Sequence, residues 1–159
     1  MLLTLLLCFV FGCIVYQDFK ERAVTWFLFP LVGLLLFFLH LQKNSLEAIL
    51  WFSMYNLLLV GIQTGILWGY TRFVAKKDFL NTSFGLGDLL FLGAFAFGFP
   101  TATFLVLMVS GLLFSLLLHW VLSYKREAST IPLAGMLGIF LSGILLCSLL
   151  PQTPSLYQL

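Results

Sequence analysis

Apolar runs separated by short polar stretches extend along the whole chain. Charged or turn-forming residues gather at 18–22, 42–45, 72–78 and 124–127, and Pro100 and Pro151 interrupt the runs. Several runs approach the roughly 20 residues that a helix needs to cross a bilayer. The pattern predicts six membrane-spanning helices, about Leu2 to Tyr16, Val24 to Leu41, Leu46 to Tyr70, Phe84 to Phe99, Pro100 to Ser123 and Ile131 to Leu150.

Two of these predicted helices have unusual compositions. The third contains Asn56, Gln63 and Thr64, which we expect to hydrogen-bond neighbouring helices. The alternative is that these side chains line a water-filled cavity. The fourth is short and carries four glycines between positions 85 and 98. Glycine permits close helix packing, or lets the backbone leave helical geometry at the start of a helix.

Composition agrees with a membrane protein. Hydrophobic residues make up 62% of the 159 residues and charged residues only 9%, too little charge to cover a soluble domain. We therefore predict an all-α polytopic membrane bundle, with residues 1–159 forming one domain. The net charge of +2 is too small to indicate nucleic-acid binding. The three cysteines, Cys8, Cys13 and Cys147, form no CxxC pair, so we expect no metal and no cofactor.

The distribution of basic residues predicts the orientation in the membrane. Because loops alternate between sides, the stretches 18–23, 71–83 and 124–130 share one face, and they hold seven of the eight basic residues. These seven are Lys20, Arg22, Arg72, Lys76, Lys77, Lys125 and Arg126. By the positive-inside rule this face is cytoplasmic and both termini are non-cytoplasmic.

Two of the six acidic residues lie where solvated surface charges are unusual. Asp18 follows the first apolar run, and Asp88 lies in the first turn of the fourth predicted helix. Taken singly, Asp18 could be a loop carboxylate paired with Arg22, and Asp88 a helix N-terminal charge favoured by the dipole. Two carboxylates held close in a poorly solvated site share a proton. One can then take a proton from water while the other donates to a scissile carbonyl, which is the chemistry of an aspartyl protease.

Other catalytic arrangements lack partners in the sequence. His40 and His119 are remote from both aspartates, and Ser110 and Ser115 have no basic neighbour except His119. Gly85 and Gly87 directly precede Asp88, so a substrate backbone could approach that carboxylate closely.

Three stretches resemble the type IV prepilin peptidases, which are GxGD membrane aspartyl proteases. They are Asp18 to Trp26, Gly85 to Ala94, which begins with Gly-Leu-Gly-Asp, and Ile131 to Leu137. The chain differs from the family pattern at Thr25, Leu90 and Ala134–Gly135, and it lacks the cysteine-containing insertion of the longer, N-methylating members. The resemblance implies a bacterial or archaeal cytoplasmic-membrane peptidase that cuts the basic leader of a prepilin-like protein, with Asp18 and Asp88 as its catalytic pair.

Alternatives to an active peptidase remain open. In a transport or assembly protein, the two aspartates would handle ions or brace helices. An inactive relative of the peptidases would retain the pair without cleaving. The expected partners are a prepilin-like substrate and membrane lipids, whose anionic headgroups suit the basic loops.

Overall fold

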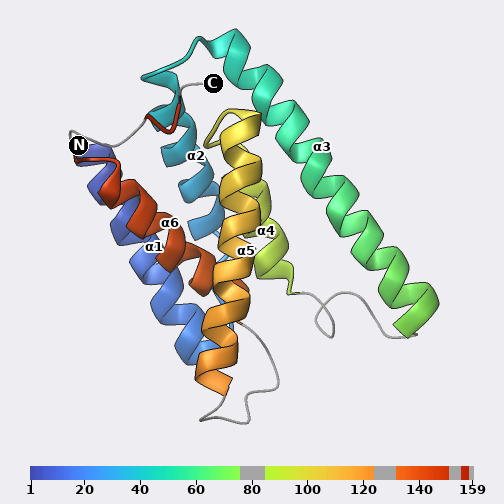
Figure 1. Ribbon diagram of the computed structural model, residues 1–159. Coiled ribbons are helices and arrows are strands. Elements are labelled where there is room, and N and C mark those ends of the chain that lie inside the picture. The colour runs from blue at the N-terminus through green and yellow to red at the C-terminus, as the bar shows by residue number, and fades with distance from the viewer. Residues whose placement is uncertain (76–84, 124–131, 151–154, 158–159) are drawn as a thin grey trace.

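The computed structural model describes residues 1–75, 85–123, 132–150 and 155–157, and in these residues the chain is helical and contains no strand. Figure 1 shows the helices arranged as a bundle. The element bounds are α1 Leu2–Glu21, α2 Leu28–Leu41, α3 Leu46–Tyr70, η1 Thr71–Ala75, α4 Leu86–Phe95, α5 Thr101–Ser123 and α6 Leu133–Cys147. The all-α prediction is confirmed.

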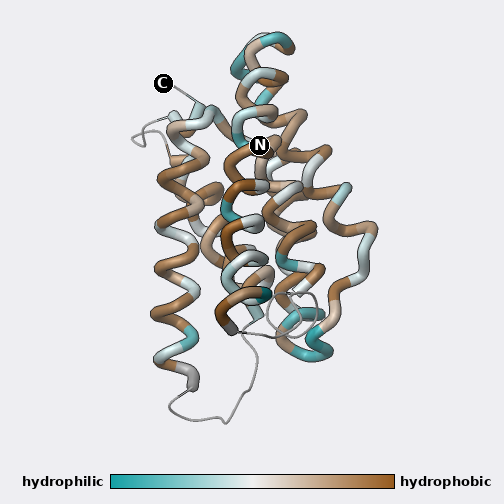
Figure 2. Tube along the Cα trace, turned by 90° about the vertical axis from the view of Figure 1, so that its right-hand side faces the viewer, coloured by the Kyte–Doolittle hydropathy of each residue, from teal (hydrophilic) through white to brown (hydrophobic). Residues whose placement is uncertain are grey.

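Apolar character and length indicate a membrane protein. Three helical segments, Leu2–Glu21, Leu46–Val74 and Thr101–Val121, are long and apolar enough to cross a bilayer, while α2, α4 and α6 are shorter apolar helices. Large apolar side chains also cover the outside of the bundle: Phe9 and Trp120 are 71% and 75% exposed. Figure 2 shows hydrophobic residues along the lengths of the helices. Such a surface is suited to lipid rather than to water.

The helix ends differ from the predicted ranges in places. α3 matches its range, and its N-cap is Ser45, whose hydroxyl accepts a hydrogen bond from the Ala48 amide at 3.4 Å. α1 continues beyond Tyr16 to Glu21, and its last turn contains a 2.9 Å hydrogen bond from Lys20 Nζ to the Tyr16 hydroxyl. Asp18 is therefore a helical residue and not a loop carboxylate, although it does interact electrostatically with Arg22 as that alternative expected.

α2 and α4 are both shorter than predicted. α2 begins at Leu28 instead of Val24, because the preceding chain folds back on α1, where the Thr25 amide donates to Gln17 Oε1 at 2.8 Å. α4 ends at Phe95, because the chain turns through 96–98 toward α5. Gly98 in this turn packs so closely on Leu36 that a Cβ would lie 3.0 Å from Leu36 Cδ2.

The core lies between α1, α2, α4, α5 and α6. α6 packs on α1 and α5, and α2 packs on α1 and α4. Aromatic rings fill the centre: Phe11 lies 5.8 Å from Phe91, and Phe95 lies 4.9 Å from Phe104, between ring centroids. α3 lies at the edge of the bundle and slants away from it (Figure 1). Its buried residues, Ile49, Ser53, Asn56 and Val60, all lie in its first fifteen residues.

The polar residues of α3 have different partners. Asn56 is fully buried, and its Nδ2 donates to the carbonyls of Ala96 and Phe99 at 3.0 and 2.9 Å. The predicted bond to a neighbouring segment is therefore confirmed for Asn56. The Thr64 hydroxyl instead donates to Val60 O of its own helix. Gln63 Oε1 is buried without a partner in the described part of the chain.

Asn56→Leu should destabilise the fold by about 1–3 kcal/mol, because it leaves two buried carbonyls in the α4–α5 connection without their donor. Thr64→Val is the matched control on the same helix, and it should change stability little because its hydroxyl bonds only to α3. Unfolding of both proteins by denaturant in detergent measures the difference. Equal stability of the two variants would contradict this role for Asn56.

Candidate active site

Asp18 lies in the last turn of α1 and points toward the start of α6. Its side chain is buried, and Oδ2 accepts a 2.7 Å hydrogen bond from the Gly135 amide. Arg22, one turn further along the chain, interacts with it electrostatically. The carboxylate is thus held in the contact between two helices instead of projecting into solvent.

Asp88 is the third residue of α4, and its carboxylate also faces the start of α6. Oδ1 accepts a 2.9 Å hydrogen bond from the Ala134 amide, and the carboxylate also bonds to the Gly85 backbone. Gly85 is the N-cap of α4, so Asp88 satisfies a free donor of its own helix while it reaches across to α6. Asp88 is partly buried.

The two aspartates meet at the N-terminus of α6. Ala134 and Gly135 are the second and third residues of that helix, and first-turn amides have no acceptor within their own helix. One carboxylate binds each of these successive amides, and both are favoured by the positive end of the helix dipole. The carboxylates also interact electrostatically with each other. The structure therefore brings the two sequence-predicted residues together.

Gly85 and Gly87 have separate packing roles beside this pair. A Cβ at position 85 would lie 2.9 Å from Asp88 Oδ2, a distance that real Cβ atoms do not adopt. A Cβ at position 87 would lie 3.4 Å from the Phe29 ring. Gly85 thus leaves space for the carboxylate, whereas Gly87 packs against Phe29 at a distance that a methyl group would also allow. Their predicted role in substrate approach stays a prediction.

The remaining candidate groups lie elsewhere. Glu21 is exposed at the end of α1. His40 is fully buried at the end of α2, where its Nδ1 lies 3.3 Å from Phe97 O. The hydroxyls of Ser110 and Ser115 donate to carbonyls of their own helix, α5. Within the described ranges, no three His, Cys, Asp or Glu side chains come together as metal ligands do.

The amides of Ala134 and Gly135 are the partners of the two aspartates that reasoning from the residues alone missed. Their stretch was notable only for its resemblance to a family segment, because a backbone amide has no signature in a sequence. The usable signal was Pro132 followed by small residues, which favours a helix start with accessible amides.

No family model, curated protein or solved structure matches the chain. The geometry of the site and the resemblance of its three stretches are therefore the basis on which a function can be proposed.

Proposed function

We propose that the chain is a membrane aspartyl endopeptidase that cuts the basic leader of a type IV prepilin-like protein. The observation that carries this proposal is the placement of the Asp18 and Asp88 carboxylates on adjacent amides of α6. The three stretches that resemble the prepilin peptidases supply the parts of this site: Asp18, Asp88 with Gly85, and the two amides.

The two carboxylates would divide the roles of base and acid. An ionised carboxylate takes a proton from water, and the resulting hydroxide equivalent attacks the scissile carbonyl carbon. The protonated partner donates to the carbonyl oxygen. The carboxyl that took the proton from water then passes it to the amide nitrogen and the C–N bond breaks, while one hydroxyl of the tetrahedral intermediate returns its proton to the partner. The amides of Ala134 and Gly135 would hold the carboxylates in place.

We further propose six spans in a bacterial or archaeal cytoplasmic membrane, with the aspartates near the cytoplasmic face and both termini on the other side. α1 and α3 end, and α4 and α6 begin, at one end of the bundle (Figure 1). Lys20, Arg22 and Arg72 belong to this end, whereas Lys43 lies between α2 and α3 at the other. The remaining basic residues of the predicted inner face, Lys76, Lys77, Lys125 and Arg126, lie outside the described residues.

Single-cysteine labelling tests this orientation. In a protein with alanine at Cys8, Cys13 and Cys147, Lys43→Cys should react with a membrane-impermeant maleimide in intact cells. Glu21→Cys, also at an exposed position, should react only after permeabilisation. The reverse pattern would invert the topology and contradict a cytoplasmic site.

Cleavage by the purified full-length chain tests the activity. The substrate is a synthetic peptide with a short basic leader followed by an apolar helix of about 20 residues. Mass spectrometry should find a single cut between leader and helix. An intact peptide, with the protein shown to be folded, would exclude the proposed activity and favour a non-cleaving relative.

A second candidate function is supported by the same hydrogen bonds. In a transport or assembly protein, Asp18 and Asp88 would brace the start of α6 by satisfying its free amides. Bracing needs only a hydrogen-bond acceptor, whereas hydrolysis needs groups that exchange protons. Amide substitutions therefore separate the two functions.

A further inference from the structure

The backbone at the end of α1 has an unusual conformation. Arg22 is the C-cap of this helix, with φ 54° and ψ 21°, and among the described residues no other non-glycine residue has a positive φ. Glycine usually occupies this left-handed position, because a Cβ there lies too close to the following carbonyl oxygen. Gln17 holds the turn, since its Oε1 accepts the Thr25 amide at 2.8 Å and the Thr25 hydroxyl at 3.0 Å. An arginine kept in a conformation that favours glycine points to a role for its side chain.

The Arg22 side chain acts on Asp18. The two residues are four positions apart at the end of α1, which is about one helical turn, and their opposite charges interact. Oδ2 of Asp18 also accepts the hydrogen bond from the Gly135 amide. A nearby cation and a donated hydrogen bond both stabilise the ionised form of a carboxylate. Asp18 is therefore the aspartate whose negative charge is doubly supported.

The electrostatic surroundings of Asp88 differ in one respect. Backbone groups of Ala134 and Gly85 also bond to this carboxylate. Within the described ranges, however, the charged side chain that acts on it is that of Asp18, which has the same sign. Two carboxylates that interact in this way do not both ionise easily. With Asp18 ionised, Asp88 is the aspartate that retains the proton.

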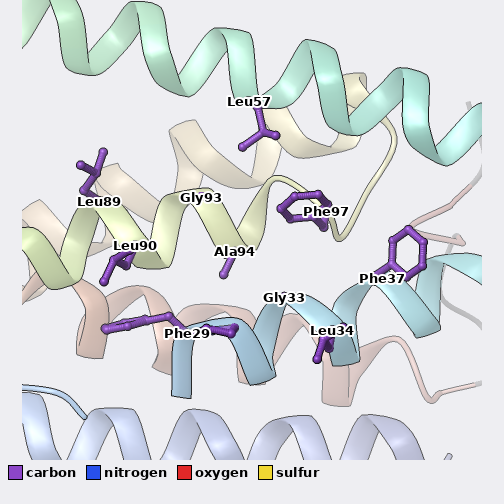
Figure 3. A pocket seen from close by; sticks show the side chains of 11 residues that line it. Phe29, Gly33, Leu34, Phe37, Leu57, Leu89, Leu90, Gly93, Ala94 and Phe97 are labelled. Carbon is purple, nitrogen blue, oxygen red and sulfur yellow. The ribbon is translucent and has the colours of Figure 1, made fainter. Parts of the chain in front are cut away.

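The elements around the pair do not alter this asymmetry. On α1, Lys20 Nζ bonds to the Tyr16 hydroxyl, and Glu21 is exposed. α2 and α6, which pack on α1 and α4, contain no Asp, Glu, Lys or Arg. Their titratable residues, His40 and Cys147, lie in the last turns of these helices, at the other end of the bundle. α4 also lines an apolar groove of about 530 Å³ with α2 and α3, and its lining side chains carry no charge (Figure 3).

We propose that Arg22 keeps Asp18 ionised, so that Asp18 is the base and Asp88 the acid of the pair. This inference rests on the proposed peptidase function, which leaves the two roles unassigned. Asp18 takes the proton from water and later passes it to the amide nitrogen. Asp88 gives its proton to the scissile carbonyl oxygen and recovers it from the tetrahedral intermediate. Arg22 is a positioning residue, because it acts through Asp18 and not on the peptide.

The pH dependence of kcat/KM for the synthetic leader peptide tests the assignment. Arg22→Gln should move the acidic limb to higher pH by roughly one unit, because Asp18 loses the cation that favours its ionised form. This is the small end of the range for an arginine beside an aspartate, since the Arg22 side chain is exposed. Arg22→Lys, which keeps the charge, should retain the native limb. An unmoved acidic limb, or a shift of the basic limb instead, would overturn the assignment.

Two further variants separate charge from packing. Lys20→Gln is the matched control, because it removes the same charge two residues earlier on α1, and its pH profile should be native. Arg22→Gly removes the cation but suits the left-handed backbone, so it should raise the temperature of unfolding in detergent and still move the acidic limb as Arg22→Gln does. A native pH profile for Arg22→Gly would show that the arginine has no electrostatic role.

Chemical labelling detects the protonated carboxyl without cleavage. Dicyclohexylcarbodiimide reacts with protonated carboxyl groups, and peptide mapping by mass spectrometry distinguishes Asp18 from Asp88. As the pH rises, Asp18 should lose its labelling before Asp88 in the native protein, and Arg22→Gln should narrow this difference. The same pattern in a protein that cuts no peptide would remove the peptidase and keep the effect of Arg22 on Asp18. Cleavage without this pattern would keep the peptidase and overturn the role of Arg22.

Discussion

Asp18→Asn and Asp88→Asn should each reduce cleavage of the prepilin-type peptide by about a thousandfold or more. Neither amide can take a proton from water or donate one as a carboxylic acid does. The rate constants of the purified variants are measured with the synthetic peptide that carries the basic leader and the apolar helix. Either substitution alone should stop turnover, because the two carboxylates have complementary roles as base and acid.

Both variants should nevertheless fold. An asparagine keeps one carbonyl oxygen, which can accept the hydrogen bond from Gly135 or from Ala134. The start of α6 therefore retains its acceptors in both variants. Asp88→Asn gives up only the second bond of that carboxylate, to the Gly85 backbone, so thermal unfolding in detergent should change little. This expectation separates loss of chemistry from loss of structure.

Glu21→Gln is the control for removing a carboxylate near the site. Glu21 lies three residues after Asp18 on the same helix, but its side chain is exposed. Cleavage should be unaffected. Full cleavage by Asp18→Asn or Asp88→Asn would refute the catalytic pair and leave the bracing function as the better account of the two aspartates.

The second large effect is expected at Gly135. A Cβ at this position would lie 3.1 Å from Asp18 Oδ2 and 3.1 Å from the Phe19 ring. Gly135→Ala must therefore push the carboxylate or the ring aside, and Gly135→Val must do so further. A misplacement of about 1 Å can cost on the order of 100-fold in rate. We expect Gly135→Val to lose about 100-fold in cleavage rate. The rate of Gly135→Ala should lie between that of Gly135→Val and that of the native protein.

Gly138→Ala is the matched control for Gly135→Ala. It adds the same methyl one turn later in the same α1–α6 contact, where the nearest atom, Val15 Cγ2, lies 3.4 Å away. Its kcat should stay close to the native value. Because Gly135 positions Asp18, which we propose as a catalytic group, its variants should lose kcat with little change in KM. A common loss of thermal stability in the two alanine variants, with equal kcat, would show that position 135 serves packing alone.

The site has a consequence for how the helices cooperate. α1 and α4 each carry one aspartate, and α6 supplies the adjacent amides that fix both. Any displacement of α6 would change the positions of both carboxylates together. Gly135 lies against both Asp18 and Phe19 of α1, so the packing of these helices and the geometry of the aspartate pair are set by the same contact.

The sequence by itself determined the helical class and the apolar surface. It also singled out Asp18 and Asp88 as the two acidic residues in unusual positions. These follow from local properties: an apolar run of given length forms a membrane helix, and a carboxylate beside hydrocarbon is unusual wherever the chain folds. It also predicted the bounds of α3, whose cap at Ser45 is a local signal.

Only the tertiary structure decided what the aspartates bind and where a groove lies. Asp18 is 117 residues away from Gly135, and Asp88 is 46 residues away from Ala134. A backbone amide becomes a partner only when a distant helix packs against it, and no residue type marks this in advance. The same holds for the extension of α1 through Asp18 and for the slant of α3, because both depend on contacts between helices.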